Sequence, residues 1–260
     1  MVNPRARIEA IYRYPVKGLS PQRLKRVALS PGSTLPADRL YAIENGPSGF
    51  DPAAPAYFPK NRFLMLMRNE RLAGLRTDFD EASHTLTIHW EGREAARGDL
   101  KTAEGRLAIE AFFRRFMPND LHGPPKVLSG QTLPGQVHSF SDMAKKVVSI
   151  INLASVAAVE NAAGAPVNPL RFRGNVLAAG WPAWHEFELL GRELNIGKAR
   201  LKVVKRIQRC AATEVDPETG IRDLPIPRTL MSSFGHADCG IYAEVIAGGD
   251  IATGDSIISE

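Results

Sequence analysis

The stretch that decides the fold is ARLKVVKRIQRCAATEVDPETG, residues 199–220. Its first half is rich in aliphatic β-branched residues, as strands are. Its second half holds Pro217, whose ring pre-sets the backbone of a turn, and Gly220, which can adopt dihedral angles that other residues avoid. Between the two halves lies Cys210, one of two cysteines in the chain, directly after Arg209. The stretch therefore predicts a strand that delivers a thiol to a tight turn.

Short strand-like runs separated by turn residues continue on both sides of this stretch. Two helices are also expected, at 103–117 after the candidate cap Thr102, and at 153–163 between Asn152 and Gly164. Many short strands with few helices predict a mainly β fold with helical inserts, of the α+β class and arranged as a barrel. The other predicted strands are ARIEAIYRYPV (6–16), RVALS (26–30), LYAIEN (40–45), FLMLM (63–67), TLTIHW (85–90), VVSII (147–151), HEFELL (185–190), CGIYAEVIA (239–247) and DSIIS (255–259).

Composition narrows the class of protein. The 260 residues suffice for one large domain or for two smaller ones that share a core. The 33 Lys and Arg exceed the 28 Asp and Glu, but they are spread along the chain without a nucleic-acid motif, so no nucleic-acid partner is expected. Two cysteines make no disulfide framework, and neither a signal peptide nor a membrane-spanning run is visible. A cytoplasmic protein without membrane contact is expected.

Cys210 is the first candidate for chemistry. The thiolate is the reactive and metal-binding form of cysteine, and cations such as Arg206 and Arg209 favour it. A small buried apolar side chain is the alternative interpretation. A second candidate is a set of basic residues, two of which precede a glycine: Lys17 in YPVKG, Arg39 in ADRLY, and Arg171 and Arg173 in RFRGN. Arginine suits two-point recognition of phosphate or carboxylate, although each cation alone is more often a solvated surface charge.

Several enzyme classes lose support. His236 and Cys239 have H-x-x-C spacing, but a structural zinc site needs four ligands. His185 and Glu186 lack the second histidine of a metalloprotease helix. The phosphate-binding G-x-x-x-x-G-K-[ST], the dinucleotide-binding G-x-G-x-x-G and the hydrolase G-x-S-x-G are all missing from the sequence.

In their order along the chain, the motifs resemble the MOSC-domain proteins, which are related to the C-terminal domain of molybdenum-cofactor sulfurase. The pattern is most similar to two-part members such as the mitochondrial amidoxime reducing component and its bacterial counterparts. The resemblance implies a MOSC-type β-barrel at 137–260, a smaller β-barrel-like N-terminal region at 1–118 packed with it, and a connector at 119–136. The motifs are YPVKG, ADRLY, FSDMAKKVVSIINLASVAAVE, RFRGN, RCAATEVDPETG and CGIYAEVIAGGDIATGD.

This resemblance implies a molybdenum–molybdopterin (Moco) site. Cys210 would be the protein ligand to molybdenum and the catalytic residue, which suits a metal that prefers soft ligands. The pterin's phosphate and polar ring edges would be held by Lys17, Arg39 and Arg173. Asp142, Asn175 and Arg209 would lie in the same cleft. The loop at 46–61 and residues 222–236 are expected to border the pocket.

The resemblance also implies an oxidoreductase that reduces small N-hydroxylated or N-oxide substrates. Two cysteines cannot hold an iron–sulfur cluster, so electrons would come from a separate flavoprotein, ferredoxin or cytochrome b5-like protein. Two alternatives stay open at this point. The chain could carry sulfur as a persulfide on Cys210, or deliver the cofactor, without catalysis. It could also be a binding module in which Lys17, Arg171 and Arg173 capture some other anion.

Overall fold

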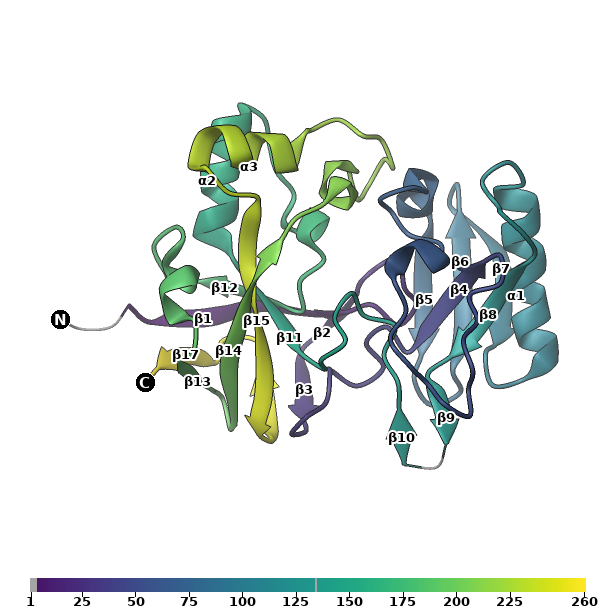
Figure 1. Ribbon diagram of the computed structural model, residues 1–260, viewed down its shortest axis with the longest axis horizontal. Helices are drawn as coiled ribbons and strands as arrows, with labels where there is room; N and C mark the ends of the chain where they lie inside the picture. The colour runs from purple at the N-terminus through teal and green to yellow at the C-terminus, as the bar shows by residue number, and fades with distance from the viewer. Residues whose placement is uncertain (1–3, 134) are drawn as a thin grey trace.

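Seven strands close into a barrel, which forms the left half of the molecule in Figure 1. The computed structural model describes residues 4–133 and 135–260. The barrel strands are β1 (Ala6–Arg13), β11 (Val148–Asn152), β12 (Val176–Ala179), β13 (Glu193–Ile196), β14 (Ala199–Gln208), β15 (Asp238–Ala247) and β17 (Ser256–Ser259). They follow the order β12–β11–β15–β14–β13–β17–β1, and β1 closes the ring by pairing with both β17 and β12.

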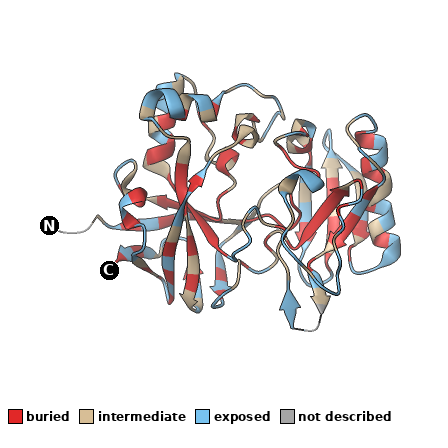
Figure 2. Cartoon of the chain, viewed as in Figure 1, coloured by how far each residue is buried: buried red, intermediate tan, exposed pale blue. Residues whose placement is uncertain are grey.

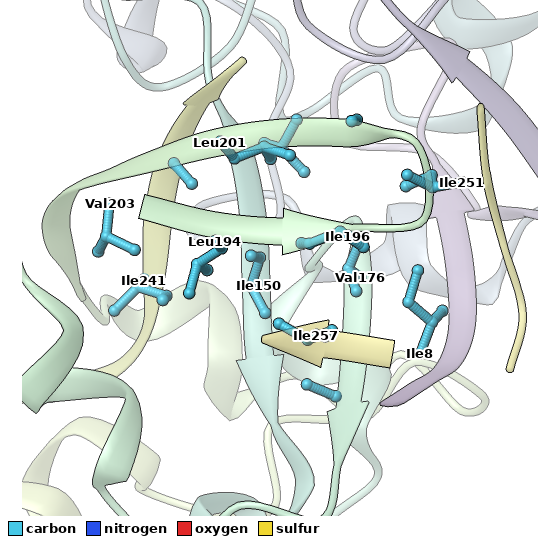
Figure 3. Close-up of a cluster of buried hydrophobic side chains, with 14 of the residues drawn as sticks. Ile8, Ile150, Val176, Leu194, Ile196, Leu201, Val203, Ile241, Ile251 and Ile257 are labelled. Atoms are coloured by element: carbon cyan, nitrogen blue, oxygen red, sulfur yellow. The ribbon is translucent and has the colours of Figure 1, made fainter. Parts of the chain in front are cut away.

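The barrel interior is filled by aliphatic side chains (Figure 3). Buried and exposed residues alternate along strands such as β14, because successive side chains of a strand point to opposite faces (Figure 2). Ile8, Ile150, Leu194, Leu201 and Ile257 are each at most 1% exposed and belong to one cluster. Because the interior is packed, a ligand site must lie outside the barrel.

The other half of the molecule carries two smaller sheets and a helix (Figure 1). The elements are β4 (Tyr41–Asn45), β5 (Arg76–Asp80), β6 (Thr85–Trp90), β7 (Arg93–Asp99), β8 (Pro125–Ser129) and α1 (Ala103–Phe116). β4 pairs with β8, and β5, β6 and β7 form an antiparallel sheet. On α1, Ile109, Phe112 and Phe113 are buried in a cluster that includes Ile88 of β6. This half therefore has a core of its own.

Short elements complete the chain and join the halves. The short strands are β2 (Gln22–Leu24), β3 (Arg26–Leu29), β9 (Gln131–Leu133), β10 (Gln136–Val137) and β16 (Gly249–Ala252). The 3-10 helices are η1 (Lys60–Arg62), η2 (Glu70–Gly74), η3 (Pro169–Phe172), η4 (His185–Leu189) and η5 (Ala211–Glu214). β3 of the first third pairs with β16 of the last. Residues 119–136, expected to connect two regions, include β8, which pairs with β4. Residues 1–3 and 134 of the predicted ranges lie outside the described residues.

Both predicted helices are confirmed. The Thr102 hydroxyl accepts a hydrogen bond from the Gly105 backbone N–H (3.0 Å) and caps α1. The second helix, α2 (Leu153–Ala163), begins at the Asn152 cap and ends at Gly164, whose φ of 67° is left-handed. A third helix, α3 (Ile226–Phe234), was not predicted. Because mainly β structure surrounds these few helices, the predicted fold class is confirmed.

Two predicted strands are wrong. Residues 185–189 of HEFELL form the 3-10 helix η4, because Glu186 turns inward and its carboxylate accepts hydrogen bonds from the side chains of Asn152 and Ser155 (both 2.8 Å). FLMLM (63–67) forms no strand beyond one bridge at Phe63. All of residues 63–66 are buried, and the chain then bends around Asn69, whose backbone N–H donates to Met65 O (2.8 Å).

No helix in the described part of the chain is both long and apolar enough to span a bilayer. The longest, α1, has 14 residues and an exposed polar face.

The buried carboxyl of Glu186 makes a testable pH dependence. Burial raises its pKa above the ordinary 4.5, although hydrogen bonds from Asn152 and Ser155 oppose the rise. A raised carboxyl pKa in the folded state gives stability that is complete below the unfolded pKa and is lost as pH rises through the folded pKa. We therefore expect the wild type to lose stability relative to Glu186→Gln as the pH rises from 5 to 8. The free energies of unfolding of both proteins are to be measured by urea unfolding.

A matched control is Glu94→Gln, which removes an exposed carboxylate from β7. It should track the wild type at every pH. If Glu186→Gln also tracks the wild type, the carboxyl is not the source of the pH dependence.

Candidate functional site

A cavity of about 270 Å³ lies between β14 and β15 of the barrel and loops of the other half. Its lining includes all seven residues that the sequence predicts for the site: Lys17, Arg39, Asp142, Arg173, Asn175, Arg209 and Cys210. These residues come from stretches as far apart as 193 positions in the chain. Eight lining residues are Lys or Arg and two are Asp, so the walls carry surplus positive charge. A cavity of this kind favours an anionic ligand.

The two cysteines have opposite surroundings. Cys210 follows β14, precedes η5 and is partly exposed. Its Sγ accepts a hydrogen bond from Lys60 Nζ at 3.1 Å. Cys239 is fully buried, and burial raises the pKa of its thiol to about 12. Only Cys210 is therefore positioned to react or to bind a metal.

A zinc site finds no support in the geometry. Within 4–133 and 135–260, no group of three or more His, Cys, Asp or Glu side chains is placed to hold a metal ion. His236 does not join a ligand set with Cys239, and its ring packs edge-on against Trp184 and Phe187. The H-x-x-C spacing is therefore a feature of the core.

The turn after Cys210 is confirmed, and it is built by Asp216. The Asp216 Oδ1 atom accepts from the backbone N–H groups of Glu218 (2.9 Å) and Thr219 (2.8 Å). Gly220 closes the turn with a φ of 73°. Before the turn, the Thr213 hydroxyl donates to Cys210 O (2.9 Å), which fixes the backbone that follows the thiol.

Arg171 is committed to this turn. Its guanidinium donates to the carboxylates of Asp216 (3.0 Å) and Asp223 (2.7 Å) and to Glu214 O (3.0 Å). The side chain is only 1% exposed. Because its charge is already neutralised within the protein, Arg171 is less suited to capture a free anion than an unpaired cation would be.

Asp142 gathers two lysines at the mouth of the cavity. Lys17 Nζ lies 2.5 Å from its carboxylate and also donates to Phe140 O (2.8 Å), and Lys60 Nζ lies 4.0 Å away. Burial opposes ionisation of Asp142, but the charges of Lys17 and Lys60 outweigh it and lower the pKa of Asp142 to about 2. Burial lowers the pKa of Lys17, and Asp142 opposes that change. Lys17 is thus ion-paired before any ligand arrives.

Lys60 is the main site residue that sequence reasoning missed. It lies at the end of the 46–61 loop, which was predicted to border the pocket, and it contacts a thiol 150 positions away. The only signal for it was the loop itself. Residues 222–236 were expected to border the same pocket, but none of them lines the cavity.

Arg39 and Arg173 meet over the ring of Tyr14. Their Cζ atoms lie 4.4 and 4.2 Å from the ring centroid, a cation–π arrangement. Arg39 Nη1 binds both carboxylate oxygens of Asp38 (2.7 and 2.6 Å), and its Nη2 donates to Arg173 O (3.0 Å). Both arginines have left-handed φ values, 49° and 50°. Such backbone strain is concentrated at functional sites.

The guanidiniums of Arg173 and Arg209 have no carboxylate within ion-pair distance among the residues that the structure describes. Arg209 donates to Phe172 O (2.8 Å) and to Cys239 O, whereas the guanidinium of Arg173 has no hydrogen-bond acceptor in the described chain. Burial lowers the pKa of Arg173 to about 10, which leaves it charged at neutral pH. Desolvated cations without counter-charges cost free energy, and an anionic ligand would remove that cost.

Asn175 lies in the cavity wall but is engaged by the barrel. Its side-chain oxygen accepts from Ser149 N (3.1 Å) and Ser149 Oγ (2.8 Å), and its nitrogen donates to Tyr12 O (3.2 Å). It therefore joins β11, β12 and the end of β1 behind the site. Contact between Asn175 and a cofactor stays a prediction.

A second cavity, of about 500 Å³, adjoins the first. The two share five lining residues: Gly18, Leu66, Arg171, Arg173 and Ala212. Arg171 and Arg173 thus border both spaces.

Curated relatives of the chain are mitochondrial proteins. It is 25% identical to mitochondrial amidoxime-reducing component 1 of Homo sapiens over 171 residues, 64% of this chain and 50% of that protein. It is 30% identical to mitochondrial amidoxime reducing component 2 of Bos taurus over 122 residues, 42% of this chain and 36% of that protein. The chain thus spans half or less of the length of these relatives.

Solved structures show only distant similarity. The YUAD protein from Bacillus subtilis is 12% identical with a TM-score of 0.43, over 97% of this chain and 94% of that one. YiiM from Geobacillus stearothermophilus is 21% identical with a TM-score of 0.35, over 44% of this chain and 53% of that one.

Family models account for nearly the whole chain. The model of the MOSC N-terminal beta barrel domain matches residues 5–116, and the model of the MOSC domain matches residues 120–258. The matched ranges contain Cys210 and every other residue predicted for the site. The chain belongs to the MOSC family.

Proposed function

We propose that this protein binds molybdenum–molybdopterin in the cavity beside Cys210 and reduces N-hydroxylated or N-oxide compounds with electrons from a separate redox protein. The observation that carries the proposal is a partly exposed thiol in a cavity where Arg173 and Arg209 lack carboxylate partners. The names of the curated relatives, amidoxime-reducing components, support the reductase form of this proposal.

The residues present fit such a cofactor. A thiolate is the kind of soft ligand that molybdenum accepts, and the partly exposed Cys210 lines the cavity. The planar guanidinium of Arg173 has no carboxylate partner in the described chain, and its shape suits a phosphate. When bound, the molybdenum centre supplies the oxygen-accepting, two-electron chemistry that side chains lack.

The chain's own groups bind, orient and supply protons. The Asp38 carboxylate holds the guanidinium of Arg39 in place, and Asp142 holds Lys17 and Lys60 at the cavity mouth. Lys60 Nζ is an N–H donor to Cys210 Sγ, so it stabilises negative charge on the sulfur. Reduction of an N–OH group to N–H releases water and consumes protons, and the partly exposed Lys60 lies where solvent protons can enter.

The deciding experiment is metal and pterin analysis of protein made in a host that produces the cofactor. Stoichiometric molybdenum and pterin, together with reduction of benzamidoxime by a viologen-reduced sample, are expected. Protein without molybdenum and pterin would refute the proposal. An added mass of about 32 Da on Cys210 in protein without molybdenum would instead indicate a sulfur carrier.

Lys60→Met tests the contact with the sulfur. Methionine keeps most of the side-chain length but removes the N–H donor. We expect the turnover of cofactor-loaded protein to fall about tenfold while its molybdenum content stays the same, because groups that hydrogen-bond to a metal ligand tune its reactivity. The matched control is Lys126→Met on the exposed face of β8. Unchanged turnover of Lys60→Met would show that the contact has no role.

A further inference from the structure

Positive side chains continue from the cavity onto the outer face of the barrel. Lys60, Lys205 and Arg206 line the cavity. Lys202 lies further along β14 and is exposed, and Lys145 reaches β15 through an ion pair with Glu244 (2.8 Å). Glu244 is the cross-strand partner of Lys202. We call four of these cations, Lys60, Lys145, Lys202 and Lys205, the basic rim. Arg206 is not part of it, because it lies opposite the buried Ile241 and over Phe187, on the other face of β14.

Half of the rim cations have no carboxylate partner. Lys145 has Glu244, and Lys60 lies 4.0 Å from Asp142. Lys202 and Lys205 have no carboxylate within ion-pair distance in the described part of the chain. The rim therefore presents a positive field to solvent.

The rim is close to the candidate metal ligand. Lys205 precedes Cys210 by five residues, which corresponds to at most roughly 17 Å of extended chain. Lys205 lies near the Cys210 end of β14 and faces Tyr242 of β15 across the ladder. A protein seated on the rim would approach the thiol side of the cavity.

Two cysteines cannot supply the four thiolates of an iron–sulfur cluster, and Cys239 is buried in the core. Resting on the proposed function, we propose that the basic rim is the docking surface for a small acidic electron-transfer protein. Surface charges of opposite sign steer such partners together and set the association rate, which salt then weakens.

A nucleic acid fits the rim less well than an acidic protein does. The sequence holds no nucleic-acid motif, and two of the four rim cations are already paired with carboxylates. Binding of an oligonucleotide is therefore an outcome that would count against the proposal.

The test is a charge reversal that leaves the cavity lining intact. Lys145→Glu with Lys202→Glu changes two rim positions that do not line the cavity. The matched control, Arg93→Glu with Arg97→Glu, makes the same change in net charge on the exposed strand β7. The probes are a flavodoxin, a plant-type ferredoxin and the soluble domain of cytochrome b5, each assayed for KM with benzamidoxime as substrate.

For the carrier that supports turnover, the rim variant should raise KM about tenfold at low salt, and the difference should disappear near 0.5 M NaCl, where the screening length falls to about 4 Å. The control variant and all viologen-driven rates should stay within about twofold of the wild type. Equal effects of the two variants, or none, would overturn the docking surface.

A direct binding titration separates this inference from the proposed function. If viologen supports no reduction by the loaded wild type, the proposed function fails, but binding of the carriers can still be measured. Binding that the rim variant weakens and the control variant keeps would support the surface. Binding of no carrier, or rim-dependent binding of an oligonucleotide or an anionic vesicle instead, would overturn it.

Discussion

Cys210→Ser is expected to lower the turnover of N-hydroxylated substrates at least about a hundredfold, because a hydroxyl is a poor substitute for a soft thiolate ligand. Serine preserves the size of the side chain and can still accept the hydrogen bond from Lys60. The loss should therefore come from the missing sulfur and not from a collapsed cavity. Turnover per folded chain, molybdenum content and pterin content are the quantities to measure.

The second thiol supplies the control for this experiment. Cys239 is 0% exposed, so Cys239→Ala should cost stability, by about 1–2 kcal/mol, but leave turnover per folded chain near the wild-type value. In cofactor-free protein, iodoacetamide should label one cysteine in the native state and none in Cys210→Ser. A Cys210→Ser protein with normal molybdenum content and normal turnover would remove the basis of the molybdenum site.

Local patterns predicted the elements whose cause is local. The cap Asn152 and the left-handed Gly164 define α2, and both can be recognised in the sequence without any tertiary information. β14 was likewise visible from its β-branched residues and from the turn that follows it. HEFELL failed because the position of Glu186 is set by Asn152 and Ser155, more than thirty residues earlier. Its pattern contains no trace of those partners.

The site shows the same division between local and distant causes. The resemblance to a family brought Cys210, Arg39 and Arg173 together before any geometry was known, and the cavity contains all three. It did not single out Tyr14, whose ring lies under both arginines, since a buried tyrosine next to a strand also fits an ordinary core. Nor did it give the pairing state of each cation. Only the contacts distinguish Arg171, which is neutralised by Asp216 and Asp223, from Arg173, which has no carboxylate partner among the described residues.

The contrast between Arg171 and Arg173 gives the second large prediction. Arg173→Met should weaken retention of the cofactor about ten- to a hundredfold, because charge-assisted hydrogen bonds contribute roughly 1.5–3 kcal/mol each. The cofactor-free variant should stay within about 1 kcal/mol of the wild type, because the guanidinium of Arg173 has no carboxylate partner to strand among the described residues and loses only its cation–π contact with Tyr14. Pterin content after dialysis and urea unfolding of cofactor-free protein measure the two effects.

Arg171→Met, two residues away, is the matched control. Its removal leaves the carboxylates of Asp216 and Asp223 without their cation, but both reach solvent, so the cofactor-free protein should lose about 1–3 kcal/mol of stability. The two substitutions are thus expected to have different effects: Arg173→Met weakens cofactor binding, and Arg171→Met lowers the stability of the fold. If Arg173→Met destabilises the cofactor-free protein as much as Arg171→Met does, or if it keeps the pterin through dialysis, then Arg173 serves the fold and the cavity loses its main anion-binding group.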